Sequence, residues 1–280
     1  MTAAGDWTGK VGDVWAREWP RTERSFAALE PLLRQAILSV APDRGQFLDL
    51  GCGVGTTGAS IAVARPDACI TGVDLSAAMV AIARERHDAS NLCFVAGDVL
   101  YMATGQPRDL VFSRHGVMFF ADPVAAFTRL RRRVRAGGPL VFSCFRGRSH
   151  NQWTVELADA TGQPSGDDRI YARGPFGFAD HAFVADLLAR TGWSVEASEA
   201  ADFDYVAGEG TDDDAAVADA VAFFTRIGPA AAVIRSASDH ARADLLERIG
   251  TRLARYARNG RVAMPASAWI WTARAAGEPA

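Results

Sequence analysis

The chain has 280 residues, of which 49% are hydrophobic and 22% are charged, and its formal net charge is −3. This length allows one large domain or two small ones, and the composition is that of an ordinary globular protein with a sizeable core. The slightly acidic balance gives no general attraction to nucleic acid or to an acidic membrane surface, so we expect neither as a partner.

The N-terminal residues and the cysteines bear on the compartment. Residues 1–7 (MTAAGDW) lack the basic and apolar regions of a signal peptide, and no apolar run is long enough to span a bilayer. The cysteines, Cys52, Cys69, Cys93 and Cys144, lie in or beside predicted strands without C-x-x-C spacing, and we interpret them as buried thiols. A cytoplasmic protein is therefore expected.

A glycine-dense turn follows the first predicted strand. The turn holds Gly51, Gly53 and Gly55, and residues 56–64 then have the pattern of a helix. Glycines remove side chains where the backbone must bend sharply and approach a ligand closely. A second apolar run ends at Asp74, nineteen residues after Gly55, where a carboxylate can accept both hydroxyls of a ribose. The opening βαβ unit is therefore predicted to bind a nucleoside-bearing cofactor.

Three interpretations of this turn compete. Residues 53–58 (GVGTTG) match G-x-G-x-x-G, which suits NAD or FAD, S-adenosylmethionine, or a tight turn without a ligand. Asp49 stands two residues before the first glycine, where a carboxylate repels a diphosphate and attracts an ammonium or sulfonium group. Lys10 is the one lysine of the chain, which excludes a Tyr-x-x-x-Lys pair, a Schiff-base lysine and a Walker lysine. Both observations favour S-adenosylmethionine.

Strands and helices alternate from residue 46 to about residue 145, a pattern that predicts a parallel sheet wrapped by helices. The predicted strands of this part are 46–50, 69–74, 92–96, 109–113 and 139–145. Its predicted helices are 56–64, 76–87 and 123–135. Later in the chain we expect helices at 151–160, 180–191, 212–227 and 237–257, and strands at 194–205 and 268–274.

Four segments in this order resemble the motifs of class I S-adenosylmethionine-dependent methyltransferases. They are 48–55 (LDLGCGVG), 73–79 (VDLSAAM), 96–98 (AGD) and 136–141 (AGGPLV). The resemblance spans about residues 7–274, and the most similar group is the ubiquinone/menaquinone-C-methyltransferase-like small-molecule enzymes. It implies a single α/β domain with a Rossmann-like seven-stranded sheet in the order 3-2-1-4-5-7-6, whose last strand is antiparallel. It also implies a helical lid at 1–40 and cap insertions at 146–178 and 207–264.

The resemblance further assigns the residues that contact the cofactor. Asp49 would help to hold the ammonium group, Asp74 would bind the ribose hydroxyls, and Asp98 would receive the adenine amino group. The loop under the methionine part would be shaped by Gly51, Gly53 and Gly55. The other contacts implied are Trp15, Leu75, Met79, Val99 and Ser113.

Several of these residues have a structural alternative. Asp49 is equally suited to cap the local turn, Asp98 suits an exposed turn, and Met79 suits a helix core. Residues 7–15 (WTGKVGDVW) resemble the W-x-G-x-x-G-x-x-W opening of the subgroup. Trp15 would close over the cofactor or, alternatively, pack the N-terminal helix against the sheet.

The loop after the fourth strand, residues 113–120 (SRHGVMFF), borders both the methyl group and the substrate in this family. His115 is the one histidine near the expected reaction centre. Its unperturbed pKa near neutrality suits a general base, and the alternative is a side chain that fills space. Reactions of this family also proceed without a strong base when methyl carbon and nucleophile are aligned.

The sequence therefore predicts an enzyme that moves the methyl group of S-adenosylmethionine to a small, largely apolar metabolite by in-line displacement, giving S-adenosylhomocysteine without a metal. An NAD(P)-dependent oxidoreductase and a non-catalytic adenosine-ligand binding protein remain as alternatives. The methyl-accepting atom and the oligomeric state are left open. Aromatic residues, each of which also suits a helical core, are predicted to enclose the acceptor: Phe119, Trp153, Phe176, Phe178 and Phe223.

Overall fold

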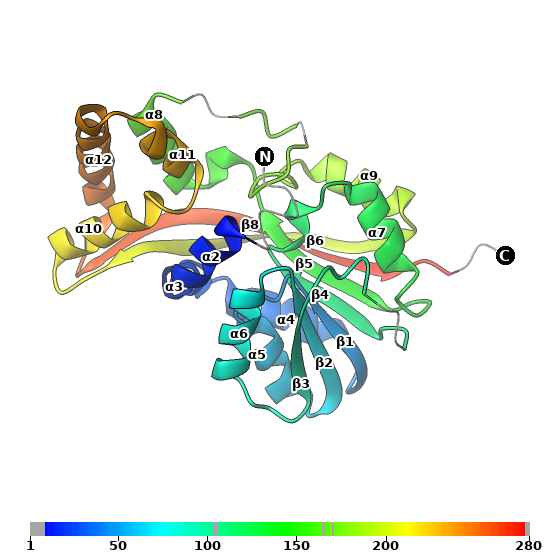
Figure 1. The fold of residues 1–280 in the computed structure, drawn as a ribbon. Coiled ribbons are helices and arrows are strands. Elements are labelled where there is room, and N and C mark those ends of the chain that lie inside the picture. Colours follow the sequence, from blue (N-terminus) through cyan, green and yellow to red (C-terminus); the bar gives the residue numbers. More distant parts are fainter. Residues whose placement is uncertain (1–8, 103–105, 164–165, 170, 278–280) are drawn as a thin grey trace.

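One sheet runs through the molecule from edge to edge (Figure 1). The computed structural model describes residues 9–102, 106–163, 166–169 and 171–277. The strands follow the order β3-β2-β1-β4-β5-β8-β6, and the two-residue strand β7 pairs with β8 outside this path. With β8 as the last long strand this is the predicted Rossmann-like order, and the predicted fold class is confirmed.

The first five strands form the parallel half of the sheet. β1 (Arg44–Leu50) pairs with β2 (Asp67–Asp74) and β4 (Leu110–Arg114), β2 pairs with β3 (Leu92–Ala96), and β4 pairs with β5 (Pro139–Phe145). The central strands β4 and β5 are almost wholly buried, as continuous apolar runs in a parallel sheet should be. All five strands lie where the sequence predicts them, within two residues at each end.

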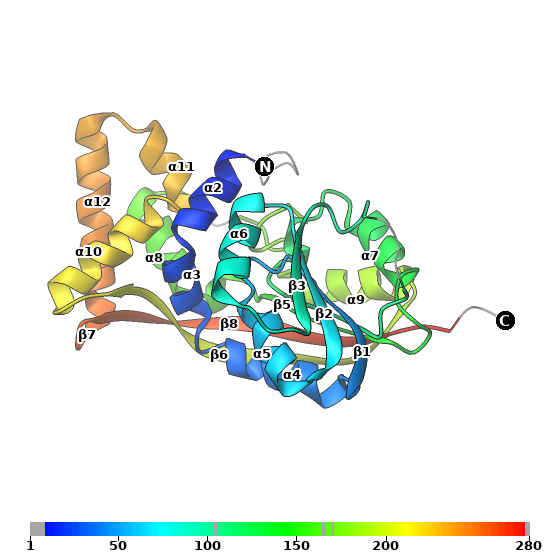
Figure 2. The ribbon, with the colours of Figure 1, turned by 60° about the horizontal axis from the view of Figure 1, so that its bottom comes forward.

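Helices cover both faces of this half. α4 (Glu30–Val40), α5 (Thr56–Ala64) and α6 (Ala77–Arg86) pack on one face, and α7 (Pro123–Arg131) and α9 (His181–Arg190) pack on the other (Figures 1 and 2).

Side-chain caps fix where three of these helices begin. Ser76, Asp122 and Asp180 each accept a backbone N–H from the first turn of α6, α7 and α9. α7 ends at Arg131, four residues before the predicted end, because residues 132–135 turn to join β5.

Beyond β5 the sheet becomes antiparallel. β8 (Arg261–Ala275) pairs with β5 on one side and with β6 (Trp193–Glu209) on the other. β7 (Ala257–Arg258) forms a hairpin with β8. β6 and β8 are longer than predicted, because they continue past β5 as a two-stranded ribbon that carries the cap helices (Figure 1).

The cap helices gather at the far end of this ribbon (Figure 1). They are α8 (Gln152–Thr161), α10 (Asp213–Phe224), α11 (Pro229–Ser236) and α12 (Asp239–Leu253). α10 lies directly on β6, since a side chain at Gly208 would stand 2.1 Å from the carbonyl oxygen of Ala216. Three of the four helices lie where the sequence predicts helices, and the short α11 was not predicted.

The N-terminal helices lie between the parallel half of the sheet and the cap (Figure 2). α2 (Lys10–Arg17) packs against α6, and α3 (Trp19–Phe26) packs against β6. Trp7 of the predicted opening motif lies outside the described residues.

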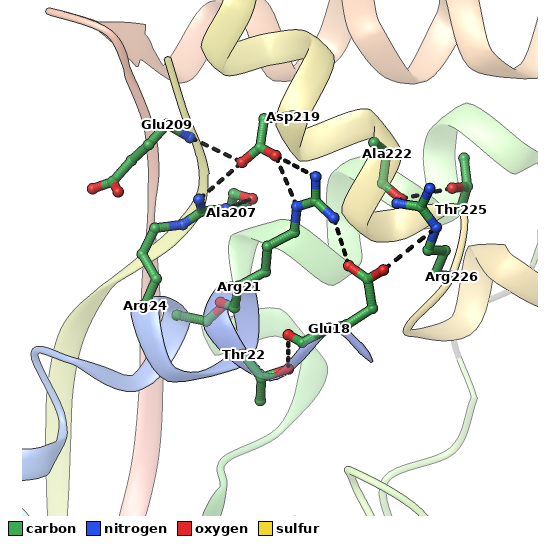
Figure 3. Close-up of polar contacts among 11 residues, drawn as sticks. Glu18, Arg21, Thr22, Arg24, Ala207, Glu209, Asp219, Ala222, Thr225 and Arg226 are labelled. Atoms are coloured by element: carbon green, nitrogen blue, oxygen red, sulfur yellow. Dashed lines mark hydrogen bonds and ion pairs between the residues drawn. The ribbon is translucent and has the colours of Figure 1, made fainter. Parts of the chain in front are cut away.

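A network of charges ties α3 to the cap helix α10 (Figure 3). Arg21 pairs at 2.7 Å with both Glu18 and Asp219, and Arg24 pairs with Asp219 at 2.8 Å. Glu18 is buried and also pairs with Arg226 at 3.4 Å. Because these charges are partly removed from water, loss of one partner would leave the others uncompensated.

Two of the four cysteines differ from the prediction. Cys52 and Cys144 are buried, whereas Cys69 and Cys93 are exposed, so the interpretation of all four as buried thiols is wrong. The two exposed thiols stand on β2 and β3, the two strands at one edge of the sheet. Within the described part of the chain, no helix is both long and apolar enough to cross a membrane.

Candidate functional site

A cavity of about 480 Å³ opens at the carboxyl ends of the parallel strands. Its walls come from the turns after β1, β2, β3 and β4, from α2 and α3, and from the segment before α9. Ligands bind at this edge in open α/β sheets, and a cavity of this size holds a small ligand.

Two glycines let the turn after β1 pass close to its neighbours. Gly51 and Gly53 have φ values of 65° and 55°, in the left-handed region that favours glycine. A side chain at Gly51 would stand 3.1 Å from the Cα of Gly116, and one at Gly53 would stand 3.3 Å from the terminal methyl of Met79. Both glycines line the cavity, so their backbone is open to a ligand.

Asp74 joins the two turns that border the cavity. Its Oδ2 accepts the N–H of Gly53 at 2.9 Å, and its Oδ1 accepts the N–H of Ser76 at 2.9 Å. Burial raises the pKa of its carboxyl, and the two hydrogen bonds oppose that shift. Each carboxylate oxygen has a further lone pair, so Asp74 can still accept two neighbouring hydroxyls of a ligand.

Acidic side chains surround a largely buried arginine beside the glycine turn. Arg114, the last residue of β4, pairs with Glu23 from α3 and with Glu30 from α4, the latter at 3.3 Å. Asp49 is 1% exposed, and its Oδ2 has no hydrogen-bond partner in the described part of the chain. Burial raises the pKa of Asp49 to about 8, against the opposing charge of Arg114.

This cluster has three carboxyl groups for one guanidinium. Asp49, Glu23 and Arg114 all line the cavity. An ammonium group would therefore find acid groups there, and a carboxylate would find Arg114. The cluster thus offers both charges that an amino-acid zwitterion needs.

An arginine holds the turn after β3 in place. Asp98 accepts the N–H of Leu100 at 2.8 Å, and both residues line the cavity. Arg133 donates to the carbonyl oxygens of Val99, Leu100 and Met102, the last two at 2.8 and 3.1 Å. The Val99 side chain belongs to the core and Val99 does not line the cavity, so its contact with a ligand stays a prediction.

His115 follows β4 and lines the cavity with an unusual conformation. Its φ of 59° lies in the left-handed region, and its side chain packs against the rings of Phe26 and Phe145 at centroid distances of 4.7 and 4.4 Å. Nδ1 lies 2.8 Å from Oγ of Ser143. Burial, with a smaller effect of the Arg114 charge, lowers the pKa of His115 to about 3. The imidazole is therefore neutral at pH 7 and a poor proton acceptor, which removes the basis for the predicted general base.

The structure brings most of the predicted residues together. Those that line the cavity are Trp15, Asp49, Gly51, Gly53, Asp74, Leu75, Met79, Asp98, His115 and Phe119.

Two predicted cofactor contacts instead hold the turns in shape. A side chain at Gly55 would stand 2.4 Å from the ring of Phe94, so this glycine is needed for packing of α5 against β3. Ser113 is fully buried, donates to the carbonyl oxygen of Leu50 at 2.6 Å and accepts the N–H of Gly116 at 3.2 Å. Neither residue lines the cavity, and their contact with a cofactor stays a prediction.

The aromatic residues of the insertions pack against one another. Trp153 lies 5.2 Å from Tyr205 and 5.8 Å from Phe176 between ring centroids. Phe178 and Phe223 are buried in the core. None of these side chains lines the cavity, and no described residue of 207–264 does. These side chains lie in the packed core, so nothing in the cavity supports the predicted enclosure of the acceptor by Trp153, Phe176, Phe178 and Phe223, which stays a prediction.

Other residues, which the sequence analysis missed, complete the walls. They are contributed by α3, by the turns after β3 and β4, by α7 and by the segment before α9, and include Glu23, Phe26, Tyr101, Arg114, Met118, Phe120, Arg129 and Arg173. Of these residues, Arg114 could have been identified from the sequence, since a charged residue that ends a buried strand needs a partner of opposite charge. In the part of the chain that the structure describes, no three His, Cys, Asp or Glu side chains gather as a metal site requires.

Comparison with known proteins finds methyltransferases among the proteins that this chain resembles. Residues 47–138 match the methyltransferase domain family. A trans-aconitate 2-methyltransferase of Paracidovorax citrulli is 32% identical over 204 residues, which are 67% of this chain and 75% of that protein. A malonyl-[acyl-carrier protein] O-methyltransferase of Acetivibrio thermocellus is 33% identical over 125 residues, or 43% of this chain and 44% of that relative's length.

A solved structure supports the fold. Phosphoethanolamine N-methyltransferase 2 of Haemonchus contortus, in complex with S-adenosyl-L-methionine, aligns with a TM-score of 0.54 and 17% identity. The alignment covers 99% of this chain and 61% of that protein. At this identity the likeness extends to the architecture alone.

Proposed function

This chain belongs to the class I S-adenosylmethionine-dependent methyltransferases, and we propose that it transfers the methyl group of S-adenosylmethionine to a small organic acid with an apolar body. The observation that carries this proposal is a single cavity in which an acid cluster with one arginine, Asp74 and Asp98 follow successive strands. The narrower likeness to ubiquinone/menaquinone C-methyltransferases remains a prediction.

The charges of the cavity fit this methyl donor. The ammonium group of its methionine part would lie against Asp49 and Glu23, and its carboxylate would lie against Arg114. Asp74 would accept the ribose hydroxyls, and Asp98 would receive the adenine amino group. A diphosphate in the same place would be repelled by Glu23, and by Asp49 where its carboxyl is ionised. Together with the family, this sets aside the oxidoreductase that the sequence left open.

The acceptor class is supported by the remaining walls of the cavity. Phe119 and Phe120 offer apolar surface, while Arg129 and Arg173 bring positive charge to the same cavity. Arg129 lies over the ring of Tyr101 at 4.7 Å from its centroid. Two relatives are named for acids, trans-aconitate and a malonyl group. An acid with an apolar body fits both the cavity walls and the names of these relatives. It is a narrower class than the largely apolar metabolite that the sequence predicts.

An acid acceptor also fits the chemistry of the buried side chains. When bound, S-adenosylmethionine supplies a methyl group on a sulfonium, and its transfer to a carboxylate oxygen gives a methyl ester and S-adenosylhomocysteine without releasing a proton. The protein then has to orient the two reactants and exclude water, and it needs no base. A neutral, buried His115 is compatible with that requirement.

The N-terminal helices would act as the lid of this site. Trp15 from α2 and Glu23 and Phe26 from α3 line the cavity, so both helices must be in place for its walls to be complete. Their link to α10 through Asp219 would hold them there.

The test is a transfer assay with matched acceptors. The purified protein is incubated with S-adenosylmethionine carrying a labelled methyl group and with pairs of small acids and their amides. We expect S-adenosylhomocysteine and methyl esters from acids, and no product from the amides. Binding of S-adenosylmethionine without any transfer would instead indicate a non-catalytic adenosine-ligand binding protein. Methylation of amides or alcohols, with acids left unmodified, would contradict the acceptor class.

A further inference from the structure

The backbone at His115 is held in a costly conformation at the cavity. A non-glycine residue with φ of 59° is strained, and such strain persists where surrounding contacts determine it. Here the His115 N–H donates to the carbonyl oxygen of Ser143 at 3.2 Å, and the Gly116 N–H donates to Oγ of Ser113 at 3.2 Å. The turn is therefore fixed on both sides of His115, and strained residues of this kind concentrate at ligand sites.

The hydrogen bond between Ser143 and His115 indicates which nitrogen of the His115 ring carries the proton. Ser143 is fully buried, and in the described structure its hydroxyl contacts one hydrogen-bond partner, Nδ1 of His115 at 2.8 Å. If the hydroxyl donates to Nδ1, both groups are satisfied. If Nδ1 donates instead, the hydroxyl proton is left without an acceptor. The first arrangement places the proton of the neutral ring on Nε2.

The resulting Nε2–H has no acceptor within the described residues. Nε2 of His115 is buried and unpartnered, and its ring lies between Phe26 and Phe145, whose rings offer no conventional acceptor. A buried N–H donor without an acceptor lowers the stability of the fold, so we looked for a group that could accept this hydrogen bond. Because His115 is among the residues that line the cavity, a ligand bound there is the available source of the missing acceptor.

We propose that His115 donates a hydrogen bond from Nε2 to a carboxylate oxygen of the methyl acceptor, and that Ser143 is the positioning residue that fixes this tautomer. The proposal rests on the proposed function and narrows it. In this tautomer Nε2 has no free lone pair, so it cannot take a proton from a hydroxyl or amine. The pair therefore favours acceptors that are already anionic, because an N–H bond to a carboxylate is stronger than one to a neutral group.

Burial, more than the charges around the ring, keeps His115 neutral. Those nearby come from β4 (Arg114), α3 (Glu23), α4 (Glu30) and β1 (Asp49), and the two glutamates are already paired with the arginine. Burial lowers the pKa of His115 most, and the Arg114 charge lowers it further. A ring that stays neutral keeps one donor and one acceptor, which is the condition the proposal needs.

The first test measures the tautomer of His115 directly and needs no methyl acceptor. The chain has five histidines, so a protein labelled with ¹⁵N-histidine gives few imidazole signals, and His115→Gln identifies the one in question. We expect a neutral ring with the proton on Nε2 between about pH 6 and pH 8. In Ser143→Ala this signal should shift toward a mixture of tautomers. A proton on Nδ1, or an imidazolium at about pH 6, would overturn the proposal.

The chain offers a matched control for this measurement. His181 and Ser198 form a second pair, with Nε2 2.8 Å from Oγ, and neither residue lines the cavity. Ser198→Ala should move the His181 signal and leave that of His115 unchanged. Because this readout does not depend on turnover, it separates failure of the tautomer assignment from failure of the proposed methyl transfer.

The second test compares two substitutions at His115. His115→Gln keeps an N–H donor, whereas His115→Ala removes it. We expect kcat/KM for the acid to fall about ten- to a hundredfold in the alanine variant and less than about tenfold in the glutamine variant. The affinity for S-adenosylmethionine should stay unchanged in both, and His181→Gln serves as control.

Two outcomes would contradict the donor role. An equal loss of kcat in both variants, with a wild-type rate that falls at low pH, would indicate a general base. A loss of S-adenosylmethionine affinity with an unchanged KM for the acid would make the carboxylate of the methyl donor the partner of His115. Either result would overturn the assignment to the acceptor.

Discussion

The two sides of the cavity are built in different ways. On the donor side, Asp74 ends β2 and Asp98 follows β3. Backbone N–H groups of the same turns and of the neighbouring glycine turn hold their carboxylates. On the acceptor side, the walls come from distant segments, with Phe26 in α3, Phe119 after β4 and Arg129 in α7. The donor side is thus fixed by local geometry, and the acceptor side depends on long-range packing.

This difference predicts how substitutions should act. A change on the donor side should weaken binding of S-adenosylmethionine and leave the rest of the fold intact. A change on the acceptor side, or in the charges that hold the N-terminal helices, should alter acceptor use at constant donor affinity. The four substitutions below test this division.

The largest effect is expected at the end of β2. Asp74→Ala removes the expected acceptor for the ribose and frees the N–H groups of Gly53 and Ser76. We expect the affinity for S-adenosylmethionine to fall about ten- to a hundredfold, which calorimetry can measure. Asp67→Ala, at the exposed start of the same strand, is the control and should bind normally. Equal affinities of the two variants would remove Asp74 from the site.

A smaller, pH-dependent effect is expected at Asp49. Burial raises the pKa of its carboxyl to about 8, so in the free protein it is mostly protonated below that pH and negative above it. An ammonium group is attracted by the negative form. We therefore expect the ratio of dissociation constants, Asp49→Asn over wild type, to rise up to about tenfold between about pH 6 and pH 8. Using the ratio cancels the ionisation of the ligand itself, and a ratio that stays flat would contradict the role of Asp49.

The same shift has a consequence for stability. The pKa of Asp49 is higher in the folded protein than its ordinary value of 3.8, so the unfolded chain releases this proton first. The contribution of Asp49 to folding stability is therefore present at low pH and is lost as the pH rises from about 4 to about 8. Urea unfolding should show a smaller decline over this range in Asp49→Asn than in wild type.

A change of a few-fold in KM for the acceptor is expected when Arg129, one of the arginines that line the cavity, is substituted. Arg129 is exposed to solvent and lies over Tyr101, so its charge acts through a screened environment. Arg129→Gln should raise KM for an acid acceptor about three- to tenfold and leave the affinity for S-adenosylmethionine unchanged. Arg132→Gln, exposed and outside the cavity, is the matched control. Equal KM values for the two variants would argue against recognition of an acid at this end.

The smallest effect on turnover is expected from the network in Figure 3. Asp219→Asn leaves Arg21 and Arg24 without their shared carboxylate. We expect a loss of about 1–2 kcal/mol in unfolding free energy and a rise of a few-fold in KM for the acceptor, because α3 supplies Phe26 and Glu23 to the cavity. Chemical unfolding and steady-state kinetics measure the two. Asp186→Asn, which breaks an exposed pair with Arg190, is the control.

The division between the two sides also explains what the sequence could predict. Gly51, Gly53 and Asp74 were identifiable because each meets a requirement inside one βα unit, a positive φ or a place at a strand end. Gly55 marks the limit of such reasoning. A glycine required by the ring of Phe94 cannot be distinguished, within one sequence, from a glycine required by a ligand.

The residues on the acceptor side meet no comparable requirement within one βα unit, so the sequence could not identify them in the same way. Trp153 and Phe176 have the composition of a binding pocket, but in the fold their rings pack against each other and against Tyr205. Whether an aromatic side chain meets a ligand or another ring depends on contacts between distant segments. The strand order was predictable from the motifs, while the length of β6 and β8 depended on the cap that they carry.

The most direct test of the account is a crystal structure with bound S-adenosylhomocysteine. We expect the amino group of this product against Asp49 and Glu23, its ribose hydroxyls on Asp74 and its adenine beside Asp98. Product bound elsewhere, or with its amino-acid end turned away from Arg114 and the acids, would contradict the claim that this cavity is built for S-adenosylmethionine.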